Sequence, residues 1–190
     1  MSDPLAAAHE VGQFLAAHKI PYIVIGGLAV QEWGNTRLTV DADLTISAPL
    51  EDATKLVQLI TEHFSSRISD PQAMAQRTRM ILVRTGDNVD VDISLALPGY
   101  EDELFRRAID LEIEPGKTVR LCSAEDLIIH KAVAGRPQDI ADIEGVVSRQ
   151  GRHLDAGYIR RWLNEFADVL ADSEIVERFE RAFRRPSSQK

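Results

Sequence analysis

The fold is decided by two short pieces of the chain, Gly26-Gly27 and Val40-Asp41-Ala42-Asp43-Leu44. The apolar run Tyr22–Ile25 before the glycines predicts a short strand that is buried on both faces. The glycines break this strand, and residues 28–33 predict a short helix. Residues 38–46 then alternate, with apolar side chains on one face and both aspartates on the other. These pieces predict a strand, a tight turn, a helix and a second strand that carries two carboxylates on one face.

The paired aspartates, Asp41 and Asp43, have two interpretations. Residues two apart on a strand point the same way, so their carboxylates repel unless a cation lies between them. Hard carboxylate oxygens suit Mg²⁺ or Mn²⁺. The alternative is a solvated strand with alternating charge, because surface carboxylates are common. The choice between a metal site and a plain surface strand therefore depends on what accompanies the pair.

The glycines are the first such feature. Glycine lets the backbone approach a ligand closely, and the helix that follows offers unpaired N–H groups and the positive end of its dipole. Gly26-Gly27 is therefore typical of a phosphate cradle, although glycines also serve plain turns.

Two further aspartates are the second feature. In Val89-Asp90-Val91-Asp92-Ile93 the acidic and apolar side chains again alternate. If this strand lies beside the Asp41 strand, it brings a third carboxylate to the metal site. Two metal ions that share a carboxylate activate an attacking hydroxyl and stabilise a leaving phosphate.

Lys131, Asp139 and Asp142 are the third feature. Lys131 falls on the apolar face of a helix predicted over residues 127–134. A lysine is rarely buried on such a face unless its charge has a partner. Its stem could snorkel at the helix edge, or its ammonium could meet a triphosphate. Asp139 and Asp142 share an inward stripe of the next helix, which indicates ion pairs or a site. Asp139 could also simply complement the helix dipole.

Composition limits the function classes. The chain has 190 residues, a net charge of −8 and one cysteine, Cys122. An acidic chain is not built for bulk adhesion to nucleic acid or to anionic membranes, so we expect no DNA and no membrane partner. A local basic patch could still hold an RNA end. The lone cysteine, the lack of a long apolar run and an N-terminus unlike a signal peptide predict a cytoplasmic protein.

The remaining patterns predict an α/β (α+β) fold, a mixed and twisted sheet of about five strands flanked by helices. We expect an α/β core over residues 1–121, a helical C-terminal region over 122–186 packed on the core, and a disordered tail over 187–190. Further expected elements are helices over 4–18, 49–63 and 138–150, strands over 79–84 and 89–97, a turn over 85–88, an extended or hairpin segment over 111–121, and two C-terminal amphipathic helices.

Together these motifs resemble the nucleotidyltransferase superfamily with the DNA polymerase β-like fold, most closely its AbiEii/AbiGii toxin-like group. The resemblance spans roughly residues 20 to 147. It rests on the glycine and Asp-x-Asp motifs, on Val91-Asp92-Ile93, and on 124–131 and 135–142, which resemble the group's downstream lysine and aspartate motifs. Asp92 fits the third-carboxylate position best because Tyr100-Glu101-Asp102-Glu103 falls where relatives begin an aromatic-acidic helix. Asp90 is the fallback.

The resemblance implies a chemistry and a set of roles. Asp41, Asp43 and Asp92 would hold Mg²⁺ or Mn²⁺, and Gly26 and Gly27 would bind the β- and γ-phosphates of a nucleoside triphosphate. Lys131 would offset phosphate charge with help from Arg37, and Asp139 or Asp142 would act as a base or support a metal ligand. The acceptor hydroxyl would belong to a tRNA 3′ end, a protein or a small molecule. A toxin-like protein further implies an antitoxin partner.

The same motifs are compatible with three alternative hypotheses about function. A catalytically silent module would keep the fold and bind a nucleotide or a partner protein. A glycosyltransferase would use Asp-x-Asp to bind a metal and a nucleotide sugar, but the chain is short and the third carboxylate and the glycines stay unexplained. A structural protein would merely carry solvated acidic strands.

Overall fold

The computed structural model describes residues 3–96 and 99–184, so the tail 187–190 lies outside the described residues. The described residues form two compact units. The core unit comprises the described residues of Met1–Leu28 and Leu38–Cys122, and the helical unit those of Ala29–Arg37 and Ser123–Lys190. The sequence-based boundary at residue 121 left residues 29–37 in the core. They group instead with the helical unit, where Arg149 and Gln150 on the seventh helix donate hydrogen bonds to backbone carbonyls of this segment.

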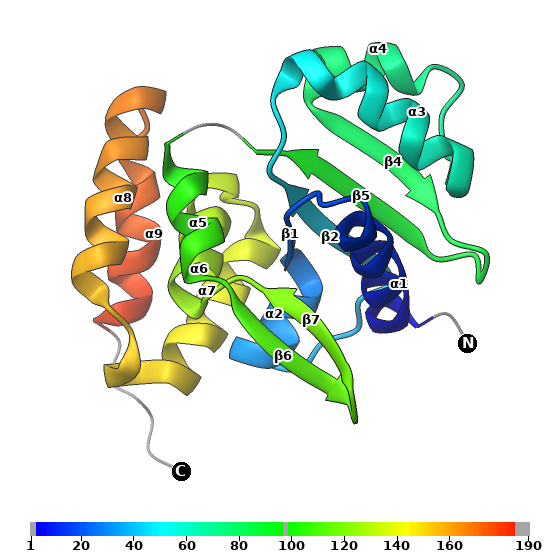
Figure 1. Cartoon of the computed structure of the whole chain (residues 1–190). Helices are drawn as coiled ribbons and strands as arrows, with labels where there is room; N and C mark the ends of the chain where they lie inside the picture. Colours follow the sequence, from blue (N-terminus) through cyan, green and yellow to red (C-terminus); the bar gives the residue numbers. More distant parts are fainter. Residues whose placement is uncertain (1–2, 97–98, 185–190) are drawn as a thin grey trace. The chain divides into compact units, whose positions relative to one another are not determined.

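A single mixed sheet forms the core unit, with the strand order β3-β4-β5-β2-β1-β7-β6 (Figure 1). Its strands are β1 (Tyr22–Ile25), β2 (Asp41–Ile46), β3 (Ser65–Ser66), β4 (Met80–Arg84), β5 (Asp90–Leu95), β6 (Ile109–Glu114) and β7 (Lys117–Leu121). The fold class is the predicted one, but the sheet has seven strands rather than about five. The difference arises because β3 is too short to show alternation and the 109–121 segment supplies two strands as a hairpin.

Strand β2 lies at the centre of the sheet and positions the aspartates. It pairs antiparallel with β1 and parallel with β5. The prediction that this strand begins at Leu38 is wrong by three residues, because its pairing with β5 starts at Asp41. The apolar side chains before that point gain no cover from the sheet: Leu38 is 84% exposed and Val40 is 64% exposed.

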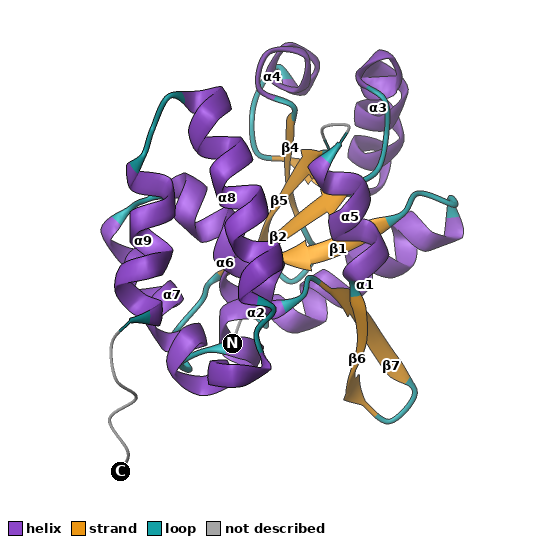
Figure 2. Cartoon of the chain, turned by 90° about the vertical axis from the view of Figure 1, so that its left-hand side faces the viewer, coloured by secondary structure: helices purple, strands orange, loops and turns teal. Residues whose placement is uncertain are grey.

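Helices cover one face of the sheet. The core unit contains α1 (Pro4–Ala17), α3 (Ala53–His63), α4 (Pro71–Thr78), α5 (Tyr100–Arg107) and the first residues of α2 (Gly26–Trp33). Both views place α1 and α3 on the same side of the strands (Figure 1, Figure 2). Gly12 of α1 packs against the ring of Tyr22, where a Cβ would lie 2.7 Å from Cε2. Helix α4 and strand β3 were not predicted, since neither shows a clear apolar period.

The helical unit consists of the rest of α2 with α6 (Ala124–Ala134), α7 (Pro137–Gln150), α8 (Ala156–Leu170) and α9 (Glu174–Phe183). Ser123 caps α6 as predicted, because its hydroxyl accepts a hydrogen bond from the Asp126 N–H at 3.1 Å. Gly135 ends this helix with a φ of +65°, a backbone conformation that favours glycine. The buried apolar stripe of the unit includes Leu127, Ile143, Leu163 and Phe179.

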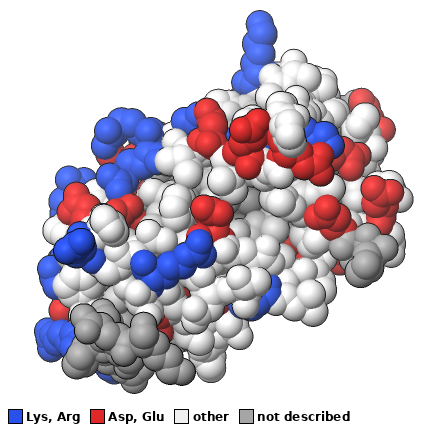
Figure 3. Space-filling view, turned by 90° about the horizontal axis from the view of Figure 1, so that it is seen from below, with Lys and Arg blue, Asp and Glu red and all other residues white. Residues whose placement is uncertain are grey.

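The surface carries many carboxylates, as the net charge of −8 predicts. Seen from below, Asp and Glu side chains gather in a band (Figure 3). Within the described ranges, no helix combines the length and the apolar character that crossing a membrane requires.

Candidate active site

Four aspartates of β2 and β5 form one acidic face of the core sheet: Asp41, Asp43, Asp90 and Asp92. The parallel register pairs Asp41 with Asp90 and Asp43 with Asp92. Alternate residues of a strand point to the same side, so all four carboxylates share a face. The four side chains are half-buried, whereas the residues between them are fully buried on the opposite face. Two neighbouring strands therefore bring together the three predicted metal ligands, and with them the fallback residue Asp90.

Gly26 lies directly against the Asp43 side chain. Ile25, the last residue of β1, pairs with Asp43, and a Cβ built on Gly26 would lie 2.6 Å from Asp43 Cγ and 2.8 Å from its Cβ. The backbone of Gly26 also has a φ of +64°, which side chains rarely adopt. Helix α2 begins at this residue, so its first unpaired N–H groups start beside the acidic face. Gly27 is the second residue of the same turn.

Arg67 and Arg84 neutralise part of the acidic face. Arg67 Nε lies 3.2 Å from Asp90 Oδ2, and its Nη1 donates a hydrogen bond to Asp92 Oδ1. Arg84 Nε lies 2.6 Å from Asp90 Oδ1. The hydrogen bond from Arg84 is the main reason that the pKa of Asp90 lies below its ordinary value, and the charge of Arg67 adds to this effect against the cost of burial.

Neither Arg67 nor Arg84 was predicted from the sequence as a site residue. Arg67 follows a strand of two residues, and no periodic pattern surrounds it. Arg84 is the last residue of β4, and in the sequence it cannot be distinguished from an ordinary solvent-exposed arginine at the end of a strand. Their partners lie 6 to 25 positions further along the chain, so only the strand order β3-β4-β5 makes them neighbours of the acidic face.

The donors of the acidic face suit a divalent metal ion. Asp41, Asp43 and Asp92 offer hard oxygen ligands from adjacent strand positions, and Gly26 leaves room for the Asp43 side chain. No group of three or more His, Cys, Asp or Glu side chains in the described part of the chain is already arranged as a metal cluster. Arg67 engages one oxygen of Asp92, and the Thr39 hydroxyl donates a hydrogen bond to Asp41 Oδ1 at 3.1 Å. A metal ion at this face would therefore compete with Arg67 for the carboxylate of Asp92.

The helical unit brings the other predicted residues together in an ion network. Lys131 Nζ lies 2.9 Å from Asp139 Oδ1 and 2.8 Å from Asp142 Oδ2. Arg37 Nε lies 3.1 Å from Asp142 Oδ1. Lys131, Asp139 and Asp142 are buried, with 8%, 1% and 4% of their surface exposed. The sequence pattern was compatible with either ion pairs or a site at these aspartates, and within this unit they form ion pairs.

Asp139 also has a second cationic partner. Arg136 Nε lies 2.8 Å from Asp139 Oδ2, and the Arg136 backbone N–H donates to the same oxygen at 3.1 Å. Burial opposes ionisation of this carboxyl, but the hydrogen bonds from Arg136 and Lys131 outweigh burial and lower its pKa. Asp139 is therefore a stable anion at neutral pH.

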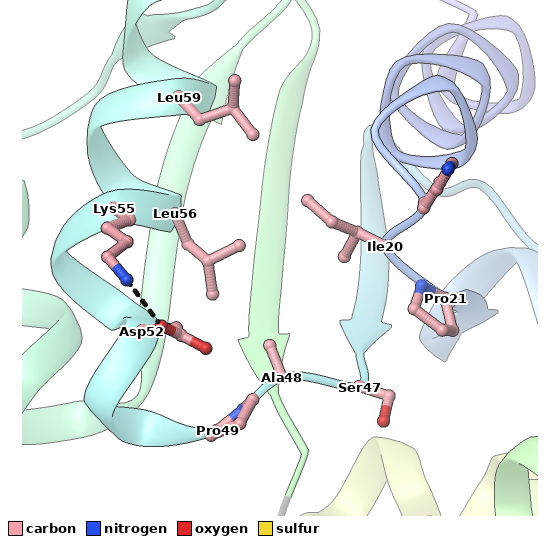
Figure 4. A pocket seen from close by; sticks show the side chains of 10 residues that line it. Ile20, Pro21, Ser47, Ala48, Pro49, Asp52, Lys55, Leu56 and Leu59 are labelled. Atoms are coloured by element: carbon pink, nitrogen blue, oxygen red, sulfur yellow. Dashed lines mark hydrogen bonds and ion pairs between the residues drawn. The ribbon is translucent and has the colours of Figure 1, made fainter.

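Two hollows of the core unit lie beyond the C-terminal end of β2, around residues 47–49. One has a volume of about 360 Å³ and is lined mainly by apolar side chains, with Leu56 and Leu59 of α3 facing Ile20 across it (Figure 4). The other has a volume of about 410 Å³ and is lined by Arg79, Glu51 and Asp102 among others. None of the predicted site residues lines either hollow, so the candidate site is the acidic face and not these cavities.

Residues 5–185 match the model of a family described as a nucleotidyltransferase of unknown function (DUF6036). No curated protein matches the sequence.

Several solved structures are similar in fold. A nucleotidyltransferase-like antigenic protein from Paracoccidioides brasiliensis has a TM-score of 0.51 and 17% identity, over 90% of this chain and 91% of that one. The solution structure of the antibiotic-resistance factor ANT(2″)-Ia has a TM-score of 0.48 and 19% identity, over 96% and 93%. The Thermotoga maritima CCA-adding enzyme complexed with tRNA has a TM-score of 0.42 and 11% identity, over 95% of this chain and 51% of that one.

These structural likenesses concern the fold alone, because identity is low and one fold hosts many functions. The predicted superfamily is confirmed by the family match, whereas the AbiEii/AbiGii likeness stays a resemblance. Since the family model spans nearly the whole chain, the chain belongs to the DUF6036 family of nucleotidyltransferases.

Proposed function

We propose that the protein transfers a nucleoside monophosphate from a nucleoside triphosphate to an acceptor hydroxyl, with Mg²⁺ or Mn²⁺ held by Asp41, Asp43 and Asp92. The observation that carries the proposal is the packing of Gly26 against Asp43 in a face whose register sets Asp43 beside Asp92. A carboxylate group and the start of a helix then lie next to each other, as a metal–triphosphate complex requires.

The chain's own residues would act by positioning and by charge. The N–H groups of Gly26 and Gly27 would bind phosphate oxygens, and the carboxylates would hold the ion. When bound, the metal ion offsets phosphate charge and orients the reacting oxygens. The acceptor oxygen forms a bond to the α-phosphorus, the bond from that phosphorus to its bridging oxygen breaks, and pyrophosphate leaves with the electron pair. The hydroxyl proton passes to a carboxylate base.

Lys131, Arg37, Asp139 and Asp142 keep the phosphate and base roles that the resemblance implies as part of the proposal. These residues already form ion pairs with one another, so a bound triphosphate would have to compete with those pairs. A triphosphate that recruits Lys131 must compete with two carboxylates at 2.9 and 2.8 Å.

The decisive test is nucleotide binding by calorimetry. We expect ATP, CTP, GTP or UTP to bind only with Mg²⁺ or Mn²⁺, and Asp43→Asn to lose that binding. Asp110→Asn is the matched control, since this exposed aspartate pairs only weakly with Arg120 at 3.5 Å. Metal-dependent binding that survives Asp43→Asn would contradict the assignment of the ion to this face.

A labelling experiment addresses the transfer and the acceptor. The protein is incubated with triphosphates labelled at the α-phosphate, together with total cell RNA, total protein or a small-molecule extract. We expect label in one of these fractions with the wild type and none with Asp43→Asn. The fraction that acquires the label identifies the acceptor as an RNA end, a protein or a small molecule.

One observation favours a second function, a catalytically silent nucleotide- or partner-binding module. Arg67 already engages Asp92, and the described carboxylates are not arranged as a metal cluster. Such a module would bind nucleotide equally well with and without divalent metal and would label no acceptor. The two experiments above therefore separate the two functions.

The toxin role rests on the resemblance to the toxin-like group and on no contact in the structure. Under this proposal, induced expression of the wild type arrests growth of a bacterial host, and Asp43→Asn does not. Growth arrest by both proteins would mean that toxicity is independent of the acidic face. Rescue of growth by co-expression of a neighbouring gene product would identify an antitoxin.

A further inference from the structure

Arg67 is a cation built into the acidic face from outside the two acidic strands. It follows β3, and its backbone N–H donates to the Leu82 carbonyl of β4 at 3.0 Å. Its side chain extends to β5, where Nε lies 3.2 Å from Asp90 Oδ2 and Nη1 bonds to Asp92 Oδ1. The guanidinium thus bridges two carboxylates, and its side chain is 25% exposed.

The two carboxylates that Arg67 bridges are not equivalent. Asp90 has both oxygens engaged, Oδ1 by Arg84 and Oδ2 by Arg67. Asp92 meets Arg67 through Oδ1 alone, and it lies beside Asp43 in the parallel register. Asp90 therefore anchors the arginines through both of its oxygens, whereas Arg67 holds Asp92, the neighbour of Asp43 in the register, through a single oxygen.

When no metal ion is bound, Arg67 offsets part of the negative charge of the acidic face. Among the four carboxylates of the acidic face, Asp90 and Asp92 pair with two guanidinium groups, those of Arg67 and Arg84. Without Arg67, like charges on adjacent strand positions would repel each other. A divalent ion bound to Asp92 would lie close to the positive charge that Arg67 places on Oδ1, so the ion and Arg67 compete for the Asp92 carboxylate.

We propose that Arg67 is the displaceable cation of the site: it holds Asp92 in the metal-free protein, yields Asp92 to the divalent ion, and stays attached to Asp90. The proposal rests on the proposed function, because it takes Asp92 to be a metal ligand. It makes Arg67 a positioning residue, one that sets the metal affinity and the side-chain conformation of Asp92.

Titration of the full chain with Mn²⁺ tests the proposal, with binding followed by calorimetry or by the electron paramagnetic resonance of free Mn²⁺. Arg67→Gln removes the competitor, and we expect it to bind Mn²⁺ about tenfold more tightly than the wild type. Arg84→Gln is the matched control, because it also removes one positive charge next to Asp90, and the ion pair of Arg84 is with Asp90 rather than with Asp92. Its Mn²⁺ affinity should rise by less than about threefold, as expected for a partly exposed charge.

Equal Mn²⁺ affinities of Arg67→Gln and Arg84→Gln would overturn the proposal and leave the metal site intact. Unchanged Mn²⁺ binding in Asp92→Asn would also overturn it, because the ion would then not use Asp92. Loss of Mn²⁺ binding from every variant, the wild type included, would overturn both this proposal and the proposed metal site. Arg67→Lys guards against misfolding: it keeps the charge, but a single ammonium cannot bridge both carboxylates, so its affinity should fall between those of the wild type and Arg67→Gln.

Discussion

At Gly26, both the backbone conformation and the geometry of the site favour glycine. Its φ is +64°, and a side chain there would meet the Asp43 carboxylate. Each constraint alone would favour glycine. Together they make this position intolerant of any other residue, although in the sequence it looks like one glycine of a turn.

Replacing Gly26 by alanine should therefore impair both the fold and the site. We expect Gly26→Ala to lower the free energy of unfolding by about 1–3 kcal/mol, the usual cost of a side chain in this backbone region, and to weaken Mn²⁺ binding by displacing Asp43. Urea unfolding and Mn²⁺ titration measure the two effects. Gly86→Ala is the control, because a Cβ at Gly86 meets nothing within 4 Å. A Gly26→Ala protein with wild-type stability and Mn²⁺ affinity would contradict the geometry.

Among the elements, α6 and α7 are joined by charge as well as by apolar packing. Lys131 of α6 meets Asp139 and Asp142 of α7, and all three side chains are almost fully buried. Removing a buried cation from between two carboxylates strongly destabilises a protein, because the carboxylates then stay buried with their negative charges uncompensated. Arg37 and Arg136 compensate part of that charge from the rim.

Lys131→Met should destabilise the protein by about 3 kcal/mol, the typical cost of breaking a buried pair from one side. Urea unfolding at neutral pH measures the change. Lys55→Met is the matched control: this lysine also pairs with an aspartate, but its side chain is 85% exposed, so the change should stay below about 0.5 kcal/mol. If Lys131→Met were as stable as Lys55→Met, the network would not join the two helices.

At the scale of the whole molecule, stability should depend on pH through Asp139. Hydrogen bonds lower its pKa in the folded protein, so its contribution is complete above the unfolded pKa of about 3.9 and is lost as the pH falls through the folded pKa. Asp139→Asn should therefore be less stable than the wild type at pH 7, and the gap should narrow below about pH 4. Urea unfolding of both proteins between pH 3 and pH 7 measures the gap, and a constant gap across this range would exclude the linkage.

Metal binding should also stabilise the whole molecule. An ion that binds only the folded state adds about 2.7 kcal/mol at a hundred times its Kd. We therefore expect Mn²⁺ to raise the melting temperature of the wild type and not that of Asp43→Asn. NaCl at the same ionic strength controls for general screening of the acidic surface. An equal rise in both proteins would indicate binding elsewhere.

Local patterns were sufficient for much of the fold. The apolar run of β1, the alternation of β2 and β5 and the capped start of α6 depend on neighbours within a few residues, so each could be predicted. The limits of these elements were harder to predict. Alternation continues back to Leu38, but a strand exists only where a partner strand pairs with it, and β5 provides that partner from Asp41 onward.

Local sequence patterns were sufficient to predict that Asp41 and Asp43 share a face, that Asp90 and Asp92 do the same, and that a helix starts at a pair of glycines, because each follows from the period of a strand or from glycine's backbone freedom. The folded structure was needed to show that β2 and β5 are parallel neighbours in a register that sets Asp43 beside Asp92. It was also needed to show that Arg67 reaches both Asp90 and Asp92. The physical reason is that strand order and register come from the burial of the whole sheet, which no short stretch of sequence contains.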